Sequence, residues 1–146
     1  MAIKQRTLII VTTLAIVVAA LAYLRDPPWL MKVTSGLSNW ETDRDGTRYR
    51  WTTGHASFFV PSSAEFVTFR LRAPKDDPTD WPITATITID DRPADVIKVN
   101  EDEWSPVRLR LAARAGRSAR RIDIKVDRVR SHNRGVQLQI DGRPSP

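Results

Sequence analysis

The chain has 146 residues, with 23 Lys and Arg against 17 Asp and Glu and a formal net charge of +6. This length accommodates one globular domain, and acids interleaved with the basic residues argue against a nucleic-acid surface, which concentrates Lys and Arg on one element. Cysteine is absent, so the sequence has no disulfide framework, no zinc–thiolate site and no cysteine for lipid attachment.

The N-terminal region contains one long apolar segment. Residues 8–24, LIIVTTLAIVVAALAYL, carry no charged side chain. As a helix they would extend about 25 Å, near the lower limit for crossing a bilayer. Lys4 and Arg6 precede the segment, and Pro27-Pro28 end it. We therefore predict a cytoplasmic N-terminus at residues 1–7 and a single transmembrane helix at residues 8–24, because basic residues favour the cytoplasmic side.

A cleaved signal peptide is the alternative interpretation of this segment. The basic start, the short apolar stretch and the Ala20-Leu21-Ala22 tripeptide are all typical of a cleavable leader. We interpret the segment as a retained anchor. Its small residues Ala15, Ala19 and Ala22 are candidates for close packing against another membrane helix.

Residues 25–46 are expected to form a juxtamembrane connector, because they contain turn formers and no clean hydrophobic period. Apolar and aromatic residues cluster near the expected membrane surface, where they would lie in the lipid interface or contact a neighbouring membrane subunit. The candidates for this contact are Tyr23, Trp29, Leu30, Met31 and Leu37.

From residue 47 onward the hydrophobic pattern has a period of two, which is typical of strands with one buried face. In the clearest case Ile83, Ala85, Ile87 and Ile89 alternate with threonines. About eight such strands predict an all-β, antiparallel β-sandwich or jelly roll at residues 47–146. The expected strands are 48–51, 56–60, 66–72, 83–90, 94–99, 104–111, 121–127 and 136–140, with a turn at 90–93.

A series of short motifs resembles a small β-sandwich domain that is appended to bacterial polytopic membrane proteins, including glycosyltransferase-like ones. The motifs are WE at 40–41, RWT at 50–52, ASF at 56–58 with Pro61, LR at 71–72 with Pro74, IDDR at 89–92, Trp104 with Val107, RIDI at 121–124 and RGV at 134–136. The resemblance covers roughly residues 40–141 and implies a shape similar to carbohydrate-binding modules. This chain departs from those proteins in lacking their large catalytic membrane portion.

The sequence offers little chemistry for catalysis. The two histidines, His55 and His132, lie far apart without a ligand motif, and the motifs of nucleophilic, phosphate-binding and zinc enzymes are missing. Acidic clusters at 76–80, 90–91 and 101–103 could bind calcium or serve a glycosidase, but solvated loop carboxylates are the expected interpretation. Trp81 follows a turn and is a candidate loop contact for a sugar or a protein. We predict a protein that is not an enzyme and has no cofactor.

Two classes of function remain. We expect an accessory subunit of a larger bacterial membrane complex, anchored in the inner membrane with its β domain in the periplasm and with integral membrane proteins and lipid as partners. A photosynthetic reaction-centre–light-harvesting assembly is one such setting. The alternative is a membrane-tethered glycan-binding module, which would present exposed aromatic residues along a groove.

Overall fold

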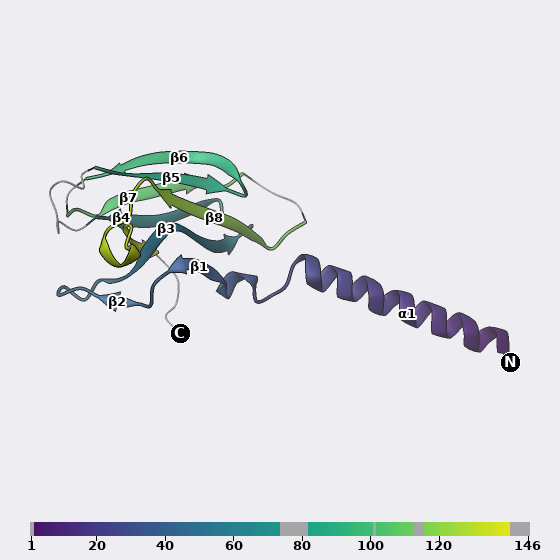
Figure 1. Cartoon of the computed structure of the whole chain (residues 1–146). Coiled ribbons are helices and arrows are strands. Elements are labelled where there is room, and N and C mark those ends of the chain that lie inside the picture. Colours follow the sequence, from purple (N-terminus) through teal and green to yellow (C-terminus); the bar gives the residue numbers. More distant parts are fainter. Residues whose placement is uncertain (1, 74–81, 101, 113–115, 141–146) are drawn as a thin grey trace.

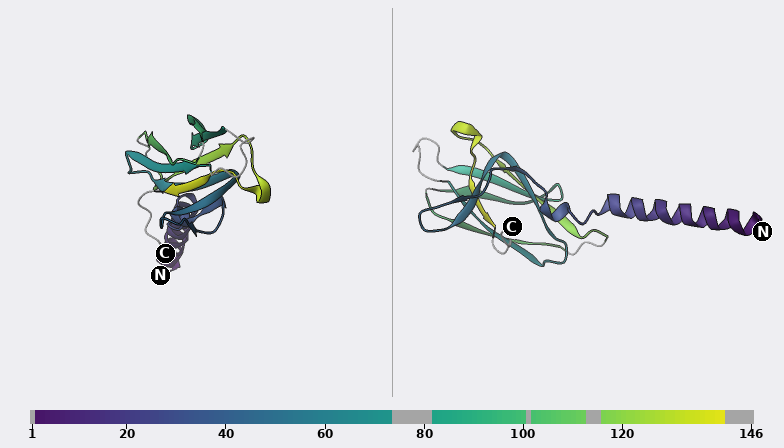
Figure 2. Two further views of the ribbon diagram at one scale, coloured as in Figure 1. Left: turned by 90° about the vertical axis from the view of Figure 1, so that its left-hand side faces the viewer. Right: turned by 90° about the horizontal axis from the view of Figure 1, so that it is seen from below.

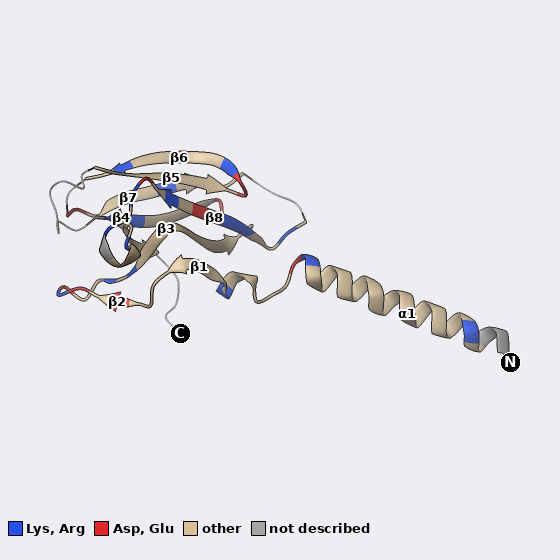
Figure 3. Cartoon of the chain, viewed as in Figure 1, with Lys and Arg blue, Asp and Glu red and all other residues tan. Residues whose placement is uncertain are grey.

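The computed structural model describes residues 2–73, 82–100, 102–112 and 116–140. A single long helix, α1 (Ala2–Arg25), extends away from a β-rich domain (Figure 1). Its 24 residues measure about 36 Å. The helix is uncharged along its central stretch (Figure 3), and it is long and apolar enough to cross a membrane. The predicted segment at residues 8–24 therefore lies within a longer helix.

The β domain is one antiparallel sheet of nine strands. Seven strands follow the order β6-β5-β8-β3-β9-β4-β7, and β1 and β2 also pair with β3. The sheet curves until it is nearly closed, and its end strands β6 and β7 contact each other. The strands are β1 (Thr34–Leu37), β2 (Glu41–Thr42), β3 (Arg48–Pro61), β4 (Phe66–Arg72), β5 (Ile83–Ile89), β6 (Arg92–Val99), β7 (Ser105–Arg110), β8 (Ala119–Val126) and β9 (Gln137–Ile140). The predicted all-β antiparallel fold, preceded by one apolar helix, is confirmed.

The core lies between two halves of this curved sheet (Figure 2). The second part of β3 pairs with β8, and the first part pairs with β9, so β3 belongs to both halves. Phe58 on β3 meets Phe69 on β4 edge to face, with ring centroids 5.9 Å apart. Both side chains are fully buried, as are Ile87 and Ile124. The inward residues of the alternating pattern thus form the hydrophobic core, as the period of two predicts.

Strand β3 replaces two separate strands that the sequence predicts at 48–51 and 56–60. Its buried residues change phase along the strand: Tyr49 and Trp51 are buried at odd positions, whereas Ala56 and Phe58 are buried at even positions. The pairing of β1 with β3 shifts register over the same stretch. An irregularity of this kind inserts extra residues and rotates the strand, which explains why the sequence pattern appears interrupted.

The expected connector at 25–46 contains two short strands and a 3-10 turn, η1 (Leu30–Lys32). Its first strand, β1, is held to β3 partly by the Arg50 side chain, which donates hydrogen bonds to the carbonyls of Ser38 and Leu37. Burial lowers the pKa of the Arg50 guanidinium from its ordinary value. Backbone pairing and one partly buried cation thus fix a segment whose side chains show no period.

Candidate functional site

The end of α1 is tied directly to the β domain. The Asp26 carboxylate accepts two hydrogen bonds from Ser118, one from its hydroxyl and one from its backbone N–H, both at 2.8 Å. Ser118 immediately precedes β8. The turn η1 also contacts β3. The apolar helix and the β domain are thus joined by a short segment, with two hydrogen bonds at Asp26 and a packing contact of η1 against β3.

A cavity of about 510 Å³ lies at this junction. Its lining includes the apolar and aromatic residues Leu24, Trp29, Leu30 and Phe59. It also includes charged residues, namely Arg25, Arg117, Arg121 and the two aspartates of the β5–β6 turn, Asp90 and Asp91. These residues come from the helix end, the β5–β6 turn, β3 and the start of β8, so only the folded chain brings them together.

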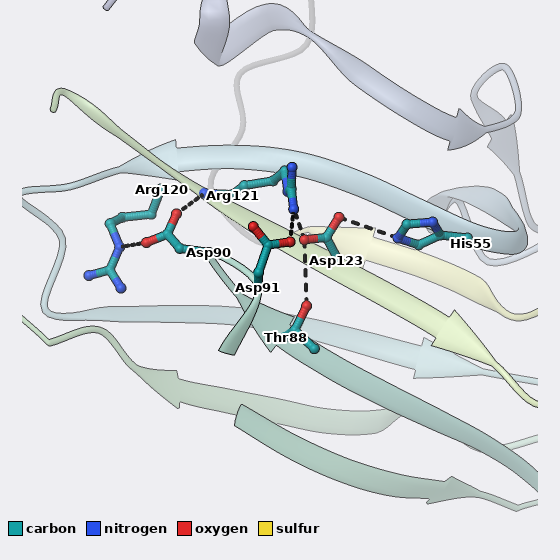
Figure 4. Close-up of polar contacts among 7 residues, drawn as sticks. All are labelled: His55, Thr88, Asp90, Asp91, Arg120, Arg121 and Asp123. Atoms are coloured by element: carbon teal, nitrogen blue, oxygen red, sulfur yellow. Dashed lines mark hydrogen bonds and ion pairs between the residues drawn. The ribbon is translucent and has the colours of Figure 1, made fainter. Parts of the chain in front are cut away.

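The β5–β6 turn carries acids that pair with arginines of β8 (Figure 4). Asp90 and Asp91 have φ values of 49° and 67°, the left-handed conformation that a tight two-residue hairpin requires and that Asp tolerates. The predicted turn at 90–93 is present, although β6 already begins at Arg92. Asp90 accepts a 2.5 Å bond from the buried Arg120, and Asp91 pairs with Arg121.

The network continues across the outer face of the sheet through Asp123. This buried carboxylate accepts a 2.8 Å bond from Arg121, faces Thr88 at 3.5 Å and lies 3.3 Å from the exposed His55 (Figure 4). The Asp123 hydrogen bond raises the pKa of Arg121, so this guanidinium stays charged. Each carboxylate of the network already has a cationic partner, and the described residues contain no group of three metal-binding side chains.

A second cluster, of arginines and aromatic rings, lies at the opposite end of the domain. Arg72 lies 4.5 Å from the Trp104 ring and 6.0 Å from the Tyr49 ring. Glu41 accepts hydrogen bonds from Tyr49 Oη and Trp51 Nε1, both at 3.2 Å. Burial, followed by the charge of Glu41, raises the pKa of Tyr49. These interactions cover the end of the core.

A smaller cavity of about 240 Å³ lies beside this cluster. Its lining includes Trp51, Thr53, His132, Asn133 and Arg134. Arg134 stacks over the Trp51 ring at 5.0 Å, and Trp51 is buried. The ring face is therefore occupied by the protein's own cation and is not available as an open stacking platform.

The predicted contact residues fall into two groups. Ala15, Ala19 and Ala22 are exposed and lie on one face of α1, because a helix repeats about every 3.6 residues. Tyr23 and Trp29 are half exposed.

The remaining predicted contact residues either are partly buried within the fold or lie outside the described residues. Leu30 and Met31 are partly buried in η1, and Leu37 packs against the core. Trp81 lies outside the described residues, as does the acidic cluster at 76–80.

The sequence did not predict the Asp26–Ser118 contact, which we call the tether, or the cavity beside it. Asp26 and Ser118 are ordinary loop residues by sequence, and nothing in their spacing indicates that they meet. Arg25 and Arg117 are also separated along the chain, yet they line one cavity. The only signal was the adjacency of Arg25-Asp26 to the end of the apolar segment.

Comparisons with known proteins give no family assignment. No family model matches the chain, and no match was found among curated proteins. One solved structure with a similar shape is a salicylyl-acyltransferase from a tetracycline biosynthetic pathway, at 13% identity and a TM-score of 0.42. The alignment covers 78% of this chain and 40% of that protein. A likeness this weak carries no argument about activity.

Proposed function

We propose that this protein is a non-catalytic accessory subunit of a larger membrane complex, anchored by α1 and presenting its β domain at the membrane surface. The observation that carries the proposal is α1 itself. The helix contributes no residue to the domain core, its apolar side chains from Leu8 to Leu24 are exposed, and the Asp26–Ser118 contact ties its end to the domain. An exposed apolar surface of this length needs lipid or another membrane helix around it.

The proposed location is the bacterial inner membrane, with the N-terminus in the cytoplasm and the β domain in the periplasm. Lys4 and Arg6 support this orientation, because cytoplasmic flanks favour basic residues. The small-residue face of α1, with Ala15, Ala19 and Ala22, is the proposed contact for a partner helix. Integral membrane proteins are the proposed partners.

The surface of the domain favours a subunit over a glycan binder. Among the tryptophans that the structure describes, Trp29 is exposed, Trp40 and Trp104 are partly buried and Trp51 is buried. Trp29 lies beside the membrane helix and not along a groove of the sheet. The outer face of β5 and β8 carries residues such as Thr86 and Lys125. A membrane-tethered glycan-binding module is the second candidate, supported by the polar residues His132, Asn133 and Arg134 around the smaller cavity.

Purification of the full-length, C-terminally tagged chain from native membranes in mild detergent tests the proposal. Mass spectrometry is expected to identify co-purifying membrane proteins in fixed stoichiometry. The Ala15→Leu/Ala19→Leu variant fills the small-residue face and is expected to reduce the partner yield at least fivefold, because overpacking costs about 1–3 kcal/mol per site. Ala20→Leu adds the same methylenes on another face and should retain the partners.

Two results would contradict this reading. Repeated recovery of the wild-type chain alone would remove the subunit hypothesis and direct attention to glycan binding. Equal partner yields from the double variant and Ala20→Leu would show that the Ala15 face is not the contact.

A further inference from the structure

We propose that the cavity at the junction of α1 and the β domain binds the phosphate headgroup of an anionic phospholipid. The inference rests on membrane anchoring by α1, as proposed above, but it does not need a protein partner. A chain that purifies without partners could therefore still satisfy it.

The cavity lies at headgroup depth. The apolar stretch of α1 ends at Leu24, and Arg25 is the first charged residue beyond it. Trp29, which is 51% exposed, has the amphipathic ring that favours the membrane interface. Both Leu24 and Trp29 line the cavity together with Arg25. A lipid beside α1 would thus have its glycerol and phosphate next to this opening.

Two guanidinium groups at the cavity could donate hydrogen bonds to a phosphate. Arg25 and Arg117 are exposed, and neither forms an ion pair with any residue that the structure describes. Arginine matches phosphate oxygens through paired N–H donors. These two side chains come from the helix end and from the loop before β8, so they approach the cavity from both of the units that the tether joins.

The acids around the cavity are already engaged. Asp26 accepts two bonds from Ser118, and Asp90 accepts a bond from Arg120. Arg121 is shared between Asp91 and Asp123. Each of these carboxylates thus has a partner other than Arg25 and Arg117.

The apolar residues of the cavity lining favour binding of a lipid over binding of free phosphate. Leu24, Leu30 and Phe59 line the cavity together with the arginines. A free inorganic anion would gain nothing from these side chains, whereas the glycerol and first acyl methylenes of a phospholipid would cover them and gain about 0.8 kcal/mol per buried CH₂. A cavity of about 510 Å³ also exceeds the need of a bare phosphate.

The test is native mass spectrometry of the full-length protein in neutral maltoside detergent, titrated with phosphatidylglycerol or with phosphatidylcholine of the same acyl chains. The wild type is expected to retain phosphatidylglycerol roughly tenfold better, since each arginine near an anionic lipid favours binding severalfold. Arg25→Gln/Arg117→Gln should lose this preference. Arg44→Gln/Arg128→Gln removes two exposed arginines remote from the cavity and should keep it. Circular dichroism of each variant checks the β fold.

Three outcomes would overturn the proposal. The first is a wild type without preference for the anionic lipid, a measurement that needs no variant. The second is an equal loss in both double variants, which would indicate general surface charge and not the cavity. The third is competition by glycerol 3-phosphate at the same concentration as the lipid, which would assign the site to a free phosphate ester.

Discussion

At the scale of single residues, Gly36 is a position that has no room for a side chain. Its φ is +63°, and a Cβ at this position would lie 1.9 Å from the carbonyl oxygen of His55. The close approach occurs where β1 passes the irregular part of β3. Glycine is therefore required here for two separate reasons, the left-handed backbone and the missing Cβ.

Gly36→Ala is expected to destabilise the domain by at least about 2 kcal/mol, because a backbone clash is added to the cost of the left-handed conformation. Gly46→Ala is the matched control, since Gly46 also has positive φ but has open space around the position of a Cβ. It should cost about 1 kcal/mol. Guanidinium unfolding of the full-length protein in detergent, followed by tryptophan fluorescence, measures both values. Equal losses in the two variants would contradict the proposed clash.

The carboxylate of Asp43 links the β2–β3 hairpin to β4. It accepts a charge-assisted hydrogen bond from Arg72 and another from the Arg44 backbone N–H, and these lower the pKa of Asp43 below its ordinary value of 3.8. A carboxyl group with a lower pKa in the folded state stabilises the fold while it is ionised. That contribution is present above the unfolded pKa and disappears as the pH falls through the folded pKa.

Acidification from about pH 5 to about pH 2 should therefore weaken the wild type more than Asp43→Asn. The measurement is the denaturant midpoint of each full-length protein across this pH range. Arg72→Gln removes the main cause of the pKa shift and should flatten the same part of the curve. Parallel curves for the wild type and both variants would exclude this role of Asp43.

At the scale of elements, regular alternation decides how well the sequence predicts a strand. The expected strands 66–72 and 83–90 agree closely with β4 and β5, whose inward residues alternate without interruption. The outcome is different for β1 and β3. The four residues of β1 have no alternation, and β3 changes phase near Thr52, so periodicity finds no strand in one case and two in the other.

The candidate site was beyond the reach of the sequence for a related reason. The apolar helix and its flanking aromatic residues follow from local composition, and the helix is present. The cavity depends instead on the start of β8 lying beside the end of α1, a tertiary contact between Asp26 and Ser118. Residues separated this widely show no joint pattern in one sequence, because their proximity is set by the order of strands in the sheet.

At the scale of the whole molecule, the Asp26–Ser118 contact joins the end of α1 to the β domain. The two hydrogen bonds contribute roughly 1 kcal/mol each. Asp26→Ala should remove both and allow the domain a wider range of orientations. The chain has no cysteine, so spin labels can be placed at Thr13→Cys in α1 and Thr86→Cys on β5 without background labelling.

Pulsed electron paramagnetic resonance in nanodiscs should give a narrow distance distribution for the doubly labelled wild type and a broader one for Asp26→Ala. Ser63→Ala, which removes an exposed hydroxyl from a neighbouring loop, is the control and should leave the distribution narrow. An unchanged width in Asp26→Ala would mean that other contacts, such as η1 against β3, hold the domain.

The strand order also determines which strands can pair first while the chain is being synthesised. The long strand β3 is made early, but its main partner β8 and its further partner β9 are made last, and β4 likewise pairs with β9. Such distant pairings form slowly and leave strand edges open to aggregation. The β5–β6 hairpin, with its tight turn, can form as soon as it emerges. A ribosome must therefore translate β9, which ends at Ile140, before the sheet can be completed.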